Sequence, residues 1–264
     1  MGMQFDKYFI QGRSGNEAVV IAGLRSGNEL AEKVYNLYSS RSADPVIFLD
    51  NIDETFSDHE IKVRLNESVN GKDVFLFQSF FNPQQDNSTN DNIMSFLIAV
   101  RAFREHGARS ITGVASYLSY ARQDKPSDYQ REPTTSRMLS DLMTAAGLDR
   151  LICLQPHTPQ IHGFFGATRL TSISSVPIWS NVFEQYRNSE ETIIVAPDIG
   201  AAKVVQYIAK NLEVSMAVAS KFRPSKEKVE IMEISGDFTG KKRAIIVDYM
   251  ISTGSTIYEV ARQR

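Results

Sequence analysis

The chain has 264 residues, 42% of them hydrophobic and 23% charged, with a formal net charge of −2. This length allows one large or two modest domains, and the near-neutral charge gives no reason to expect a nucleic-acid or membrane partner. The single cysteine, Cys153, excludes an intrachain disulfide framework and indicates a reducing compartment, so we expect a cytoplasmic protein. No apolar run approaches the roughly 20 residues that cross a bilayer, and the N-terminus lacks a signal-peptide pattern.

Strand-like and helix-like segments alternate along the first half of the chain. Apolar runs predict strands at residues 19–22, 46–49, 72–79, 110–115 and 151–154. Helical spacing predicts helices at residues 29–38, from Asn92 as cap to Gly107, and around 138–143 with an end at Gly147. The polar segments 83–92 and 120–133 are predicted to be loops.

The second half repeats this order. Strands are predicted at residues 192–196, 214–219, 229–234 and 244–247, with a helix near 201–211. The stretch 168–188, which has Ser-rich flanks and the only tryptophan, marks where one half passes into the other. Strands that alternate with crossover helices predict an α/β fold with parallel sheets in two similar domains.

Residues 243–256 carry the strongest local sign of chemistry. Residues 245–247 form a continuous β-branched run, which predicts a strand buried on both faces of a parallel sheet. Asp248 follows this strand, and a turn rich in hydroxyls and glycine at 252–256 precedes an expected helix. Backbone N–H groups, hydroxyls and a positive helix end suit a phosphate. We therefore expect a phosphorylated small molecule here, with a plain Ser/Thr helix cap as the alternative.

Four other segments place polar side chains after predicted strands, where α/β proteins bind ligands. Residues 120–125 are dense in groups that bind phosphates or nucleobases, and His157 is held between two prolines. Asp198 lies at a strand-to-helix turn, where it suits ribose hydroxyls or magnesium. Residues 220–228 form a basic segment suited to closing over phosphates. The respective alternatives are a solvated loop, a structural histidine, a helix N-cap and an exposed loop.

The order of these segments resembles that of one enzyme family. The strongest match combines the runs Tyr120-Ala-Arg-Gln-Asp-Lys, Pro133-Thr-Thr-Ser-Arg and His157-Thr-Pro-Gln-Ile-His-Gly-Phe-Phe. Further matches, in sequence order, are the runs at 56–61, 67–74, 90–94, 197–198, 221–223 and 248–256. From about Val19 to its last residue, the chain is similar to the ribose-phosphate diphosphokinases, also called phosphoribosyl-diphosphate synthetases.

The resemblance implies an α/β fold of two similar phosphoribosyltransferase-like domains with mostly parallel central sheets, at residues 15–166 and 167–264. It implies transfer of the β,γ-diphosphoryl group of Mg-ATP to the anomeric hydroxyl of ribose 5-phosphate, which gives phosphoribosyl diphosphate and AMP. Mg²⁺ is the implied cofactor. A homo-oligomer is also implied, because in the family the segment around Phe56 serves the ATP site of a neighbouring subunit.

The roles of single residues follow from the same resemblance. The ATP-contacting residues would be Phe56, Asp58, Glu60, Arg122, Gln123, Asp124 and His157, with Phe56 stacked on the adenine. The ribose phosphate would be bound by Asp198, Asp248, Ser252, Thr253, Gly254, Ser255 and Thr256. Lys221 and Arg223 would be catalytic, by neutralising charge on the migrating group, and His157 and Asp198 would be metal ligands. Such transfers rely mainly on positioning and electrostatic stabilisation.

Departures from the family pattern fall on the acceptor and metal side. Tyr249 stands where a second acid is usual, Ser252 replaces the leading acid of the phosphate loop, and Gln155 replaces an acid before the histidine. A glycine of the usual turn after Asp198 has become bulkier. The end at Arg264 predicts that the closing strand and C-terminal regulatory contacts of the family are missing.

These departures leave three functions open. The leading one is a diphosphokinase that acts on ribose 5-phosphate, or on a larger 5-substituted ribose such as ADP-ribose, because Tyr249 and Ser252 reshape that end of the site. The second is a catalytically weak or inactive relative that regulates an active synthetase. The third is a phosphoribosyltransferase that acts on a base, which the duplicated architecture and the segment 120–125 disfavour.

Overall fold

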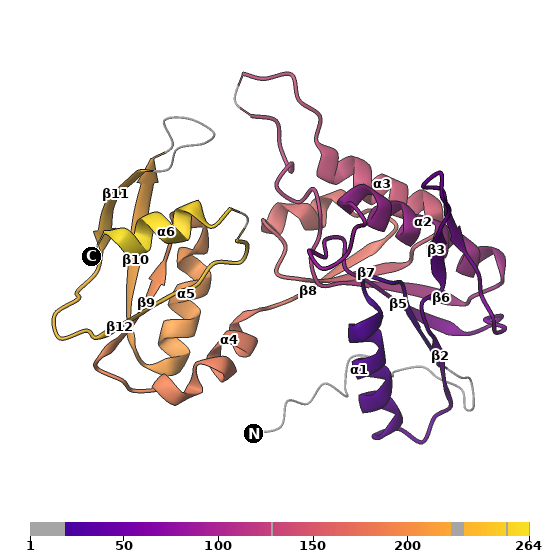
Figure 1. Cartoon of the computed structure of the whole chain (residues 1–264), viewed down its shortest axis with the longest axis horizontal. Coiled ribbons are helices and arrows are strands. Elements are labelled where there is room, and N and C mark those ends of the chain that lie inside the picture. The colour runs from indigo at the N-terminus through magenta and orange to yellow at the C-terminus, as the bar shows by residue number, and fades with distance from the viewer. Residues whose placement is uncertain (1–18, 128, 223–229, 252, 264) are drawn as a thin grey trace. The chain divides into compact units, whose positions relative to one another are not determined.

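The chain folds into two compact units, Met1–Ile173 and Ser174–Arg264, here called the first and the second unit (Figure 1). The computed structural model describes residues 19–127, 129–222, 230–251 and 253–263, with the backbone alone at 221–222 and 230–232. The sequence predicts a domain boundary between residues 166 and 167. The division lies after β8 (Arg169–Ile173), because this strand pairs with β7 in the first sheet.

The first unit is built on a six-stranded sheet with the strand order β2-β1-β5-β6-β7-β8. Besides β8, its strands are β1 (Val19–Gly23), β2 (Val46–Leu49), β5 (Asp73–Gln78), β6 (Ser110–Ala115) and β7 (Arg150–Leu154). Every neighbouring pair is parallel. The carboxyl ends of all six strands therefore meet at one edge, where ligands of α/β proteins bind.

Helices cover both faces of this sheet (Figure 1). They are α1 (Asn28–Ser39), α2 (Thr89–Glu105) and α3 (Thr135–Ala146). Side chains alternate along β1, so Val20 and Ala22 join the core beneath α2 and α3. Val19 and Ile21 pack on the opposite face, against α1. The first unit thus has two layers of core, one on each side of its sheet.

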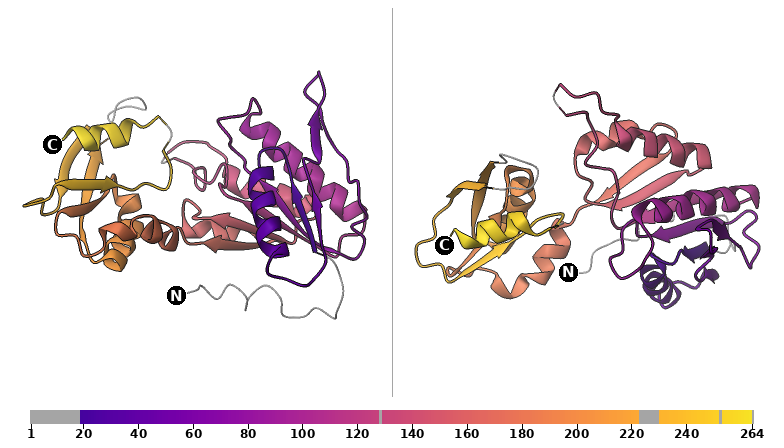
Figure 2. Two further views of the ribbon diagram at one scale, coloured as in Figure 1. Left: turned by 60° about the horizontal axis from the view of Figure 1, so that its bottom comes forward. Right: turned by 45° about the horizontal axis from the view of Figure 1, so that its top comes forward.

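A two-stranded antiparallel hairpin, β3 (Asp53–Thr55) and β4 (Ile61–Val63), was not predicted from the sequence. It projects from the rest of the first unit (Figure 2). Its base is fixed by Asp53, whose buried carboxylate accepts hydrogen bonds from the Arg25 backbone N–H (2.8 Å) and from Ser95 Oγ (2.7 Å). The hairpin is therefore anchored both to the loop after β1 and to α2.

The second unit is a four-stranded sheet with the order β11-β10-β9-β12. Its elements are β9 (Thr192–Ala196), β10 (Ser215–Phe222), β11 (Glu230–Ser235), β12 (Arg243–Ile246), α4 (Val176–Val182), α5 (Ile199–Leu212) and α6 (Ser255–Arg262). Strand β9 pairs in parallel with both β10 and β12, and only β10 and β11 are antiparallel. Helix α5 packs on one face of the sheet, and Val260 of α6 packs on the other.

The expected α/β fold with mostly parallel central sheets is confirmed. The helix cap at Asn92 is a wrong prediction, because α2 already begins after Ser88. Ser88 and Asp91 form a reciprocal capping box, so Asn92 lies inside the helix and is buried. In the described part of the chain, no helix is long and apolar enough to span a membrane.

The strand predicted at residues 245–247 is less buried than expected. Strand β12 ends at Ile246 and lies at the edge of the described sheet, with Ile245 and Ile246 only half-buried. Val247, one residue beyond the strand, is the buried member of the run. A continuous β-branched run therefore indicated the strand correctly but not its place in the sheet.

Candidate active site

Two loops of the first unit meet at the carboxyl edge of its sheet. One follows β6 and contains Arg122 and Gln123, whose side chains are exposed, and the other follows β7 and contains His157. Because β6 and β7 are neighbouring parallel strands, the loops that follow them begin side by side. The first loop is braced by hydrogen bonds from Gln123 N–H to Tyr120 O (2.9 Å) and from Ser136 N–H to Gln123 O (3.2 Å).

Asp124 connects these two loops. Thr158 Oγ1 donates a hydrogen bond to Asp124 Oδ2 (2.6 Å), and His157 Nδ1 lies 3.9 Å from the same oxygen. The side chains of Asp124 and His157 are 11% and 27% exposed, respectively. The structure thus brings together two of the predicted ATP-contacting residues, and it adds Thr158, which the sequence analysis did not select.

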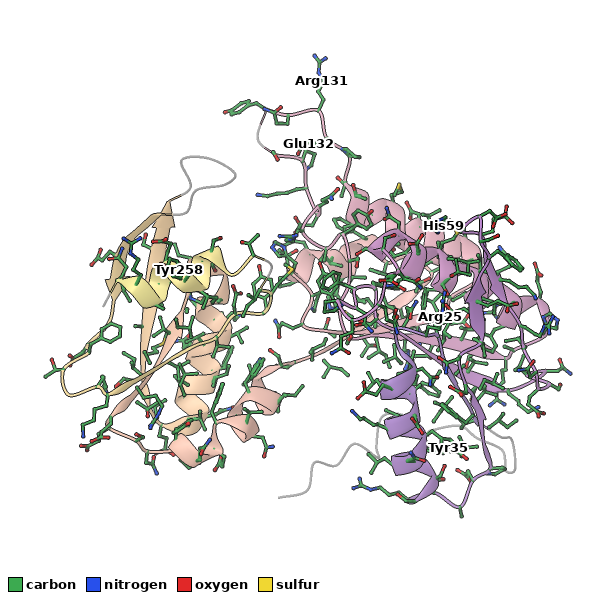
Figure 3. All side chains as sticks on the ribbon, viewed as in Figure 1. Arg25, Tyr35, His59, Arg131, Glu132 and Tyr258 are labelled. Atoms are coloured by element: carbon green, nitrogen blue, oxygen red, sulfur yellow. The ribbon has the colours of Figure 1, made fainter. Side chains whose placement is uncertain are left out.

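Beyond Asp124, the loop after β6 projects away from the sheet before it enters α3. Its outer part carries Arg131 and Glu132 (Figure 3). Glu132 Oε2 accepts hydrogen bonds from the backbone N–H (3.0 Å) and the hydroxyl (2.7 Å) of Ser127. These bonds tie Glu132 to Ser127 within the projecting part.

The predicted adenine-binding residues lie on the turn of the hairpin β3–β4. Phe56, Asp58 and Glu60 are all exposed, and 47% of the Phe56 surface is accessible. The turn is held by hydrogen bonds from Phe56 N–H to Glu60 O (2.8 Å) and from Glu60 N–H to Asp58 Oδ1 (3.1 Å). Lys62 Nζ lies 5.5 Å from the centroid of the Phe56 ring, and its ammonium is bound by Glu54 (2.6 Å). An exposed aromatic ring on a fixed turn suits stacking on a base.

The N-terminus of α2 contacts both the hairpin and the loop after β6. Tyr120 Oη donates a hydrogen bond to Asn90 Oδ1 (2.5 Å). The next residue of the helix, Asp91, has its pKa lowered chiefly by hydrogen bonds from Ser88, with a smaller electrostatic contribution from His59 on the hairpin turn. This helix end is therefore bonded to the loop after β6 and lies near the hairpin turn, two segments that the sequence assigns to ATP.

In the second unit, the two predicted ribose-binding acids lie at the same sheet edge. Asp198 follows β9 and Asp248 follows β12, and these strands are parallel neighbours. Asp198 Oδ1 accepts a hydrogen bond from the Ala201 N–H (3.0 Å), so this residue is also the N-cap of α5. The alternative interpretation of Asp198 as a helix cap is therefore confirmed, and a cap does not prevent the carboxylate from binding a ligand as well.

The predicted phosphate loop leads into α6. Gly254 is the N-cap of α6, and its φ of 77° favours glycine. Thr253 Oγ1 lies 3.0 Å from Ser255 Oγ and accepts a hydrogen bond from the Ser255 N–H (3.4 Å). A threonine hydroxyl therefore caps one N–H group, in line with the alternative of a Ser/Thr cap, and the other N–H groups of the first helical turn can serve an anion. Ser252 lies outside the described residues.

Of the two predicted catalytic residues, the structure describes only the backbone of Lys221. The backbone of Lys221 lies near the end of β10, beside a shift in its register with β11. Its side chain and the whole of Arg223 lie outside the described residues. Their roles stay predictions.

The acids of the second unit fit a magnesium site of the common nucleotide-bound type. Mg²⁺ is usually held by one or two carboxylates, with waters and substrate phosphates as its other ligands. Asp198 and Asp248 at one sheet edge supply such a pair. Over the described ranges, no three His, Cys, Asp or Glu side chains cluster as a protein-only metal cage. The predicted metal ligands were Asp198 and His157. His157 belongs to the first unit and Asp198 to the second, so the surroundings of each are described separately.

The only cysteine is not a nucleophile of this site. Cys153 is buried in β7, and burial raises the pKa of its thiol to about 11, with a smaller opposing effect from Ser172. At neutral pH the group is therefore a protonated thiol, which is a poor nucleophile.

Comparisons with known proteins identify the family of the chain. A family model for the N-terminal domain of ribose phosphate pyrophosphokinase matches residues 19–147. A ribose-phosphate pyrophosphokinase of Aquifex aeolicus is 34% identical over 246 residues, which covers 93% of this chain and 74% of the relative. Relatives of the same name from Caldanaerobacter subterraneus and Clostridium acetobutylicum are 38% and 40% identical over 207 residues. The chain covers 63% and 62% of their lengths, which is less than two thirds.

A solved structure supports the fold. The crystal structure of a phosphoribosylpyrophosphate synthetase from Mycobacterium smegmatis is similar with a TM-score of 0.76 at 28% identity. It matches 94% of this chain, which covers 76% of that protein. The two sheets, whose strands are mostly parallel, and the helices that cover them define an α/β protein. Within that class, the chain belongs to the ribose-phosphate pyrophosphokinase family, as the resemblance implied.

Proposed function

We propose that this protein transfers the β,γ-diphosphoryl group of Mg-ATP to the anomeric hydroxyl of ribose 5-phosphate, giving phosphoribosyl diphosphate and AMP. The observation that carries this proposal is the edge formed by β9 and β12 in the second unit. Asp198 and Asp248 follow these paired strands, and the glycine turn that opens α6 comes a few residues later. Family membership supports the same conclusion.

On the acceptor side, the turn around Gly254 binds the 5-phosphate through backbone N–H groups, helped by the hydroxyls of Thr253, Ser255, Thr256 and Ser252. Asp198 and Asp248 bind the ribose hydroxyls. A carboxylate accepts two such hydrogen bonds, which fixes the sugar ring and so aims its anomeric oxygen. Bound Mg²⁺ would neutralise the phosphate oxygens during transfer, and the same two carboxylates and His157 would contribute to its surroundings.

On the donor side, Phe56 stacks on the adenine, and Asp58 and Glu60 read its edge from the hairpin turn. Arg122 and Gln123 bind the ATP phosphates from the loop after β6. Lys221 and Arg223 neutralise the charge that develops on the migrating group. The hairpin projects from its own unit, so we propose that it completes the ATP site of a second copy in a homo-oligomer.

The test is AMP formation by the purified protein from Mg-ATP, with ribose 5-phosphate as acceptor. Asp248→Asn removes one charged acceptor of hydrogen bonds, which is worth roughly 1.5–3 kcal/mol, so the rate should fall about 10- to 100-fold. Asp237→Asn is the matched control, because Asp237 is an exposed aspartate of the same unit that accepts a bond from Thr239 N–H (2.9 Å). An Asp237→Asn rate near that of the wild type is expected. No AMP from the folded wild-type protein with any ribose phosphate refutes the proposal.

A larger acceptor is a second candidate, on account of one observation. Tyr249 stands beside Asp248 and is exposed at the acceptor edge, where the family pattern has an acid. A phenol ring can stack on a base or a second sugar, so ADP-ribose is tested in parallel. AMP with ADP-ribose but not with ribose 5-phosphate supports this acceptor, and AMP with neither, while ATP still binds, supports the regulatory relative.

A further inference from the structure

The hairpin β3–β4 carries a buried carboxylate at its base. The side chain of Asp53 is 1% exposed, whereas that of Glu54, the next residue of β3, is 57% exposed and pairs with Lys62 inside the hairpin. A buried carboxylate is costly unless hydrogen bonds and a nearby positive charge compensate it. The groups that compensate Asp53 therefore show what this residue holds in place.

The partners of Asp53 come from outside the hairpin. Its Oδ1 accepts a hydrogen bond from the Arg25 backbone N–H (2.8 Å), and its Oδ2 accepts one from the buried Ser95 Oγ (2.7 Å) of α2. Arg25, which lies in the loop after β1 (Figure 3), also forms an ion pair between its Nε and Asp53 Oδ2 at 3.5 Å. One carboxylate thus joins the hairpin to two other elements of the first unit.

Backbone hydrogen bonds at the base of the hairpin meet at one residue. The Ile52 N–H donates to Gly23 O (3.3 Å), and the Ile52 carbonyl accepts from the Arg64 N–H (2.9 Å). Bonds that meet at a single residue fix where the hairpin begins. They leave its tilt to contacts further along the strand.

Arg25 makes such a contact. Its Nη2 donates a hydrogen bond to Thr55 Oγ1, in addition to the ion pair with Asp53. Asp53 and Thr55 are two positions apart, so their side chains lie on the same face of β3. The Arg25 side chain therefore holds this face of the strand at two successive points, which resists a tilt of the hairpin.

We propose that Asp53 and Arg25 are positioning residues for ATP, which fix the direction in which the hairpin presents the Phe56 ring to the adenine. The role of Phe56 in this proposal rests on the proposed function. Three residues of strand span about 10 Å, so a tilt of about 10° at Asp53 would displace Phe56 by about 2 Å. Aromatic stacking holds only over a narrow range of ring separations, so such a displacement weakens it. Neither Asp53 nor Arg25 needs to touch the nucleotide for this effect.

The KM for ATP is the first readout. Asp53→Asn keeps the shape of the side chain but removes the charge that pairs with Arg25. The KM for ATP should rise about two- to tenfold, the range that stacking of one ring supports, while kcat and the KM for ribose 5-phosphate stay nearly unchanged. Thr55→Val removes only the hydroxyl that Arg25 binds and should raise the KM for ATP about twofold, which keeps the proposal testable if Asp53→Asn does not fold.

Asp73→Asn is the matched control. Asp73 is another aspartate of the first unit with an arginine and a serine as partners, because Arg109 Nη2 lies 2.6 Å from its Oδ2 and Ser110 Oγ donates to its Oδ1 (2.6 Å). It is the first residue of β5, at the amino edge of the sheet, whereas the hairpin follows the carboxyl end of β2. Asp73→Asn should leave the KM for ATP unchanged. Slow reaction of the buried Cys153 with a thiol reagent shows that each variant is folded.

A double-mutant cycle separates the aiming of Phe56 from general damage. Phe56→Ala should itself raise the KM for ATP, and Asp53→Asn should then add less than about twofold, because no ring is left to aim. The proposal is overturned if Asp53→Asn and Thr55→Val leave the KM unchanged. It is also overturned if Asp53→Asn acts equally with and without Phe56, or if Asp73→Asn has the same effect.

The same cycle is measured on the Kd for ATP by calorimetry if the wild type binds ATP but makes no AMP. A rise in Kd that depends on Phe56 then supports the positioning and refutes only the proposed function. A folded wild-type protein that does not bind ATP overturns both.

Discussion

The two units begin with the same arrangement of elements but use it differently. In the first unit, β1, α1 and β2 form a parallel crossover, and β5 pairs with the other side of β1. In the second unit, β9, α5 and β10 form the same crossover, and β12 takes the place of β5. Strand order reverses at β1 and at β9, and such reversal points are the usual ligand sites of α/β sheets.

Polar side chains pack together in the loop after β1 of the first unit, whereas the glycine turn after β12 of the second unit has open space beside Gly254. After β1, Ser26 Oγ lies 2.5 Å from Gln85 Oε1 and 2.9 Å from Asn92 Oδ1, so polar side chains are packed together there. After β12, Gly254 has open space where a Cβ would stand, and Thr253 is exposed. The candidate site of the first unit lies instead after β6 and β7. Shared topology therefore sets where a site can form, and the local side chains decide whether a ligand can enter.

The largest expected effect comes from the loop after β1 in the first unit, where Gly27 is closely packed. At Gly27 an added Cβ would lie 2.4 Å from Phe77 O and 2.6 Å from Gln78 Cα, so backbone would have to move. Gly27→Ala should therefore destabilise the first unit by about 3 kcal/mol, the upper end of overpacking costs. Cys153 in the first unit and Trp179 in the second report the two units separately during urea unfolding. In Gly27→Ala, the thiol of Cys153 should become exposed at a lower urea concentration than in the wild type.

Gly166→Ala is the matched control, because nothing lies within 4 Å of its added Cβ and it belongs to the same unit. Its unfolding midpoint should stay near that of the wild type. A Gly27→Ala protein as stable as Gly166→Ala would mean that the loop after β1 is not packed closed, and the contrast between the two units would be lost.

The second prediction concerns the turn after β12 in the second unit, which contains Gly254. Gly254 and Gly240 have φ values of 77° and 72°, and both have open space for a Cβ. Alanine at either site should cost about 1 kcal/mol, because the left-handed conformation is strained for residues with a Cβ. Only Gly254→Ala should also raise the KM for ribose 5-phosphate, by about tenfold, as expected for one lost hydrogen bond of about 1.4 kcal/mol. Equal KM values for the two variants would argue against a phosphate at this turn.

Sequence patterns predicted the elements well where burial alone decides them. The runs that became β6 and β9 lie within buried sheets, and their predicted bounds match the structure. The hairpin β3–β4 was missed because its strands have three residues each and carry charges, which gives no alternating pattern. The cap of α2 was misplaced although Ser88 and Asp91 form a capping box, because several polar residues precede Asn92 and compete for that role.

The candidate site was predictable only as a set of segments. Arg122 and His157 were selected because the order of motifs matches a family, not because the sequence shows them near each other. The bond between Thr158 and Asp124 spans 34 positions, and it depends on the parallel register of β6 and β7. The sequence does not show that register, so it could not predict that these two loops meet.

The third prediction concerns two aspartates, one in each unit, whose pKa values are lowered by hydrogen bonds from nearby residues. Hydrogen bonds from the Ser88 hydroxyl and N–H lower the pKa of Asp91, and bonds from Thr239 lower the pKa of Asp237. A carboxyl whose folded pKa lies below the unfolded value of about 3.9 stabilises the fold fully above that pH. The contribution is lost as the pH falls through the folded pKa.

Asp91→Asn should therefore lower the melting temperature of the first unit at about pH 6, by an amount that corresponds to less than about 1 kcal/mol. The difference from the wild type should shrink as the pH falls through the lowered folded pKa of Asp91, because the wild-type carboxyl then becomes protonated as well. Ser88→Ala should behave in the same way, since it removes the hydroxyl of the same cap. A difference that persists unchanged at low pH would show that shape, and not charge, stabilises this end of α2.

The smallest expected effect concerns the hairpin, a feature of the first unit. Lys62 Nζ lies 5.5 Å from the centroid of the Phe56 ring, and Glu54 holds its ammonium. An exposed cation–π contact contributes about 0.5–1 kcal/mol, so Lys62→Met should raise the KM for ATP about two- to fivefold by freeing the ring. Lys33→Met is the control, because Lys33 pairs with Glu29 on the surface of α1. Equal changes in the KM for ATP in Lys62→Met and Lys33→Met would show that the charge of Lys62 matters and not its place on the ring. A change in Lys62→Met alone would assign the Phe56 ring to the base of the nucleotide.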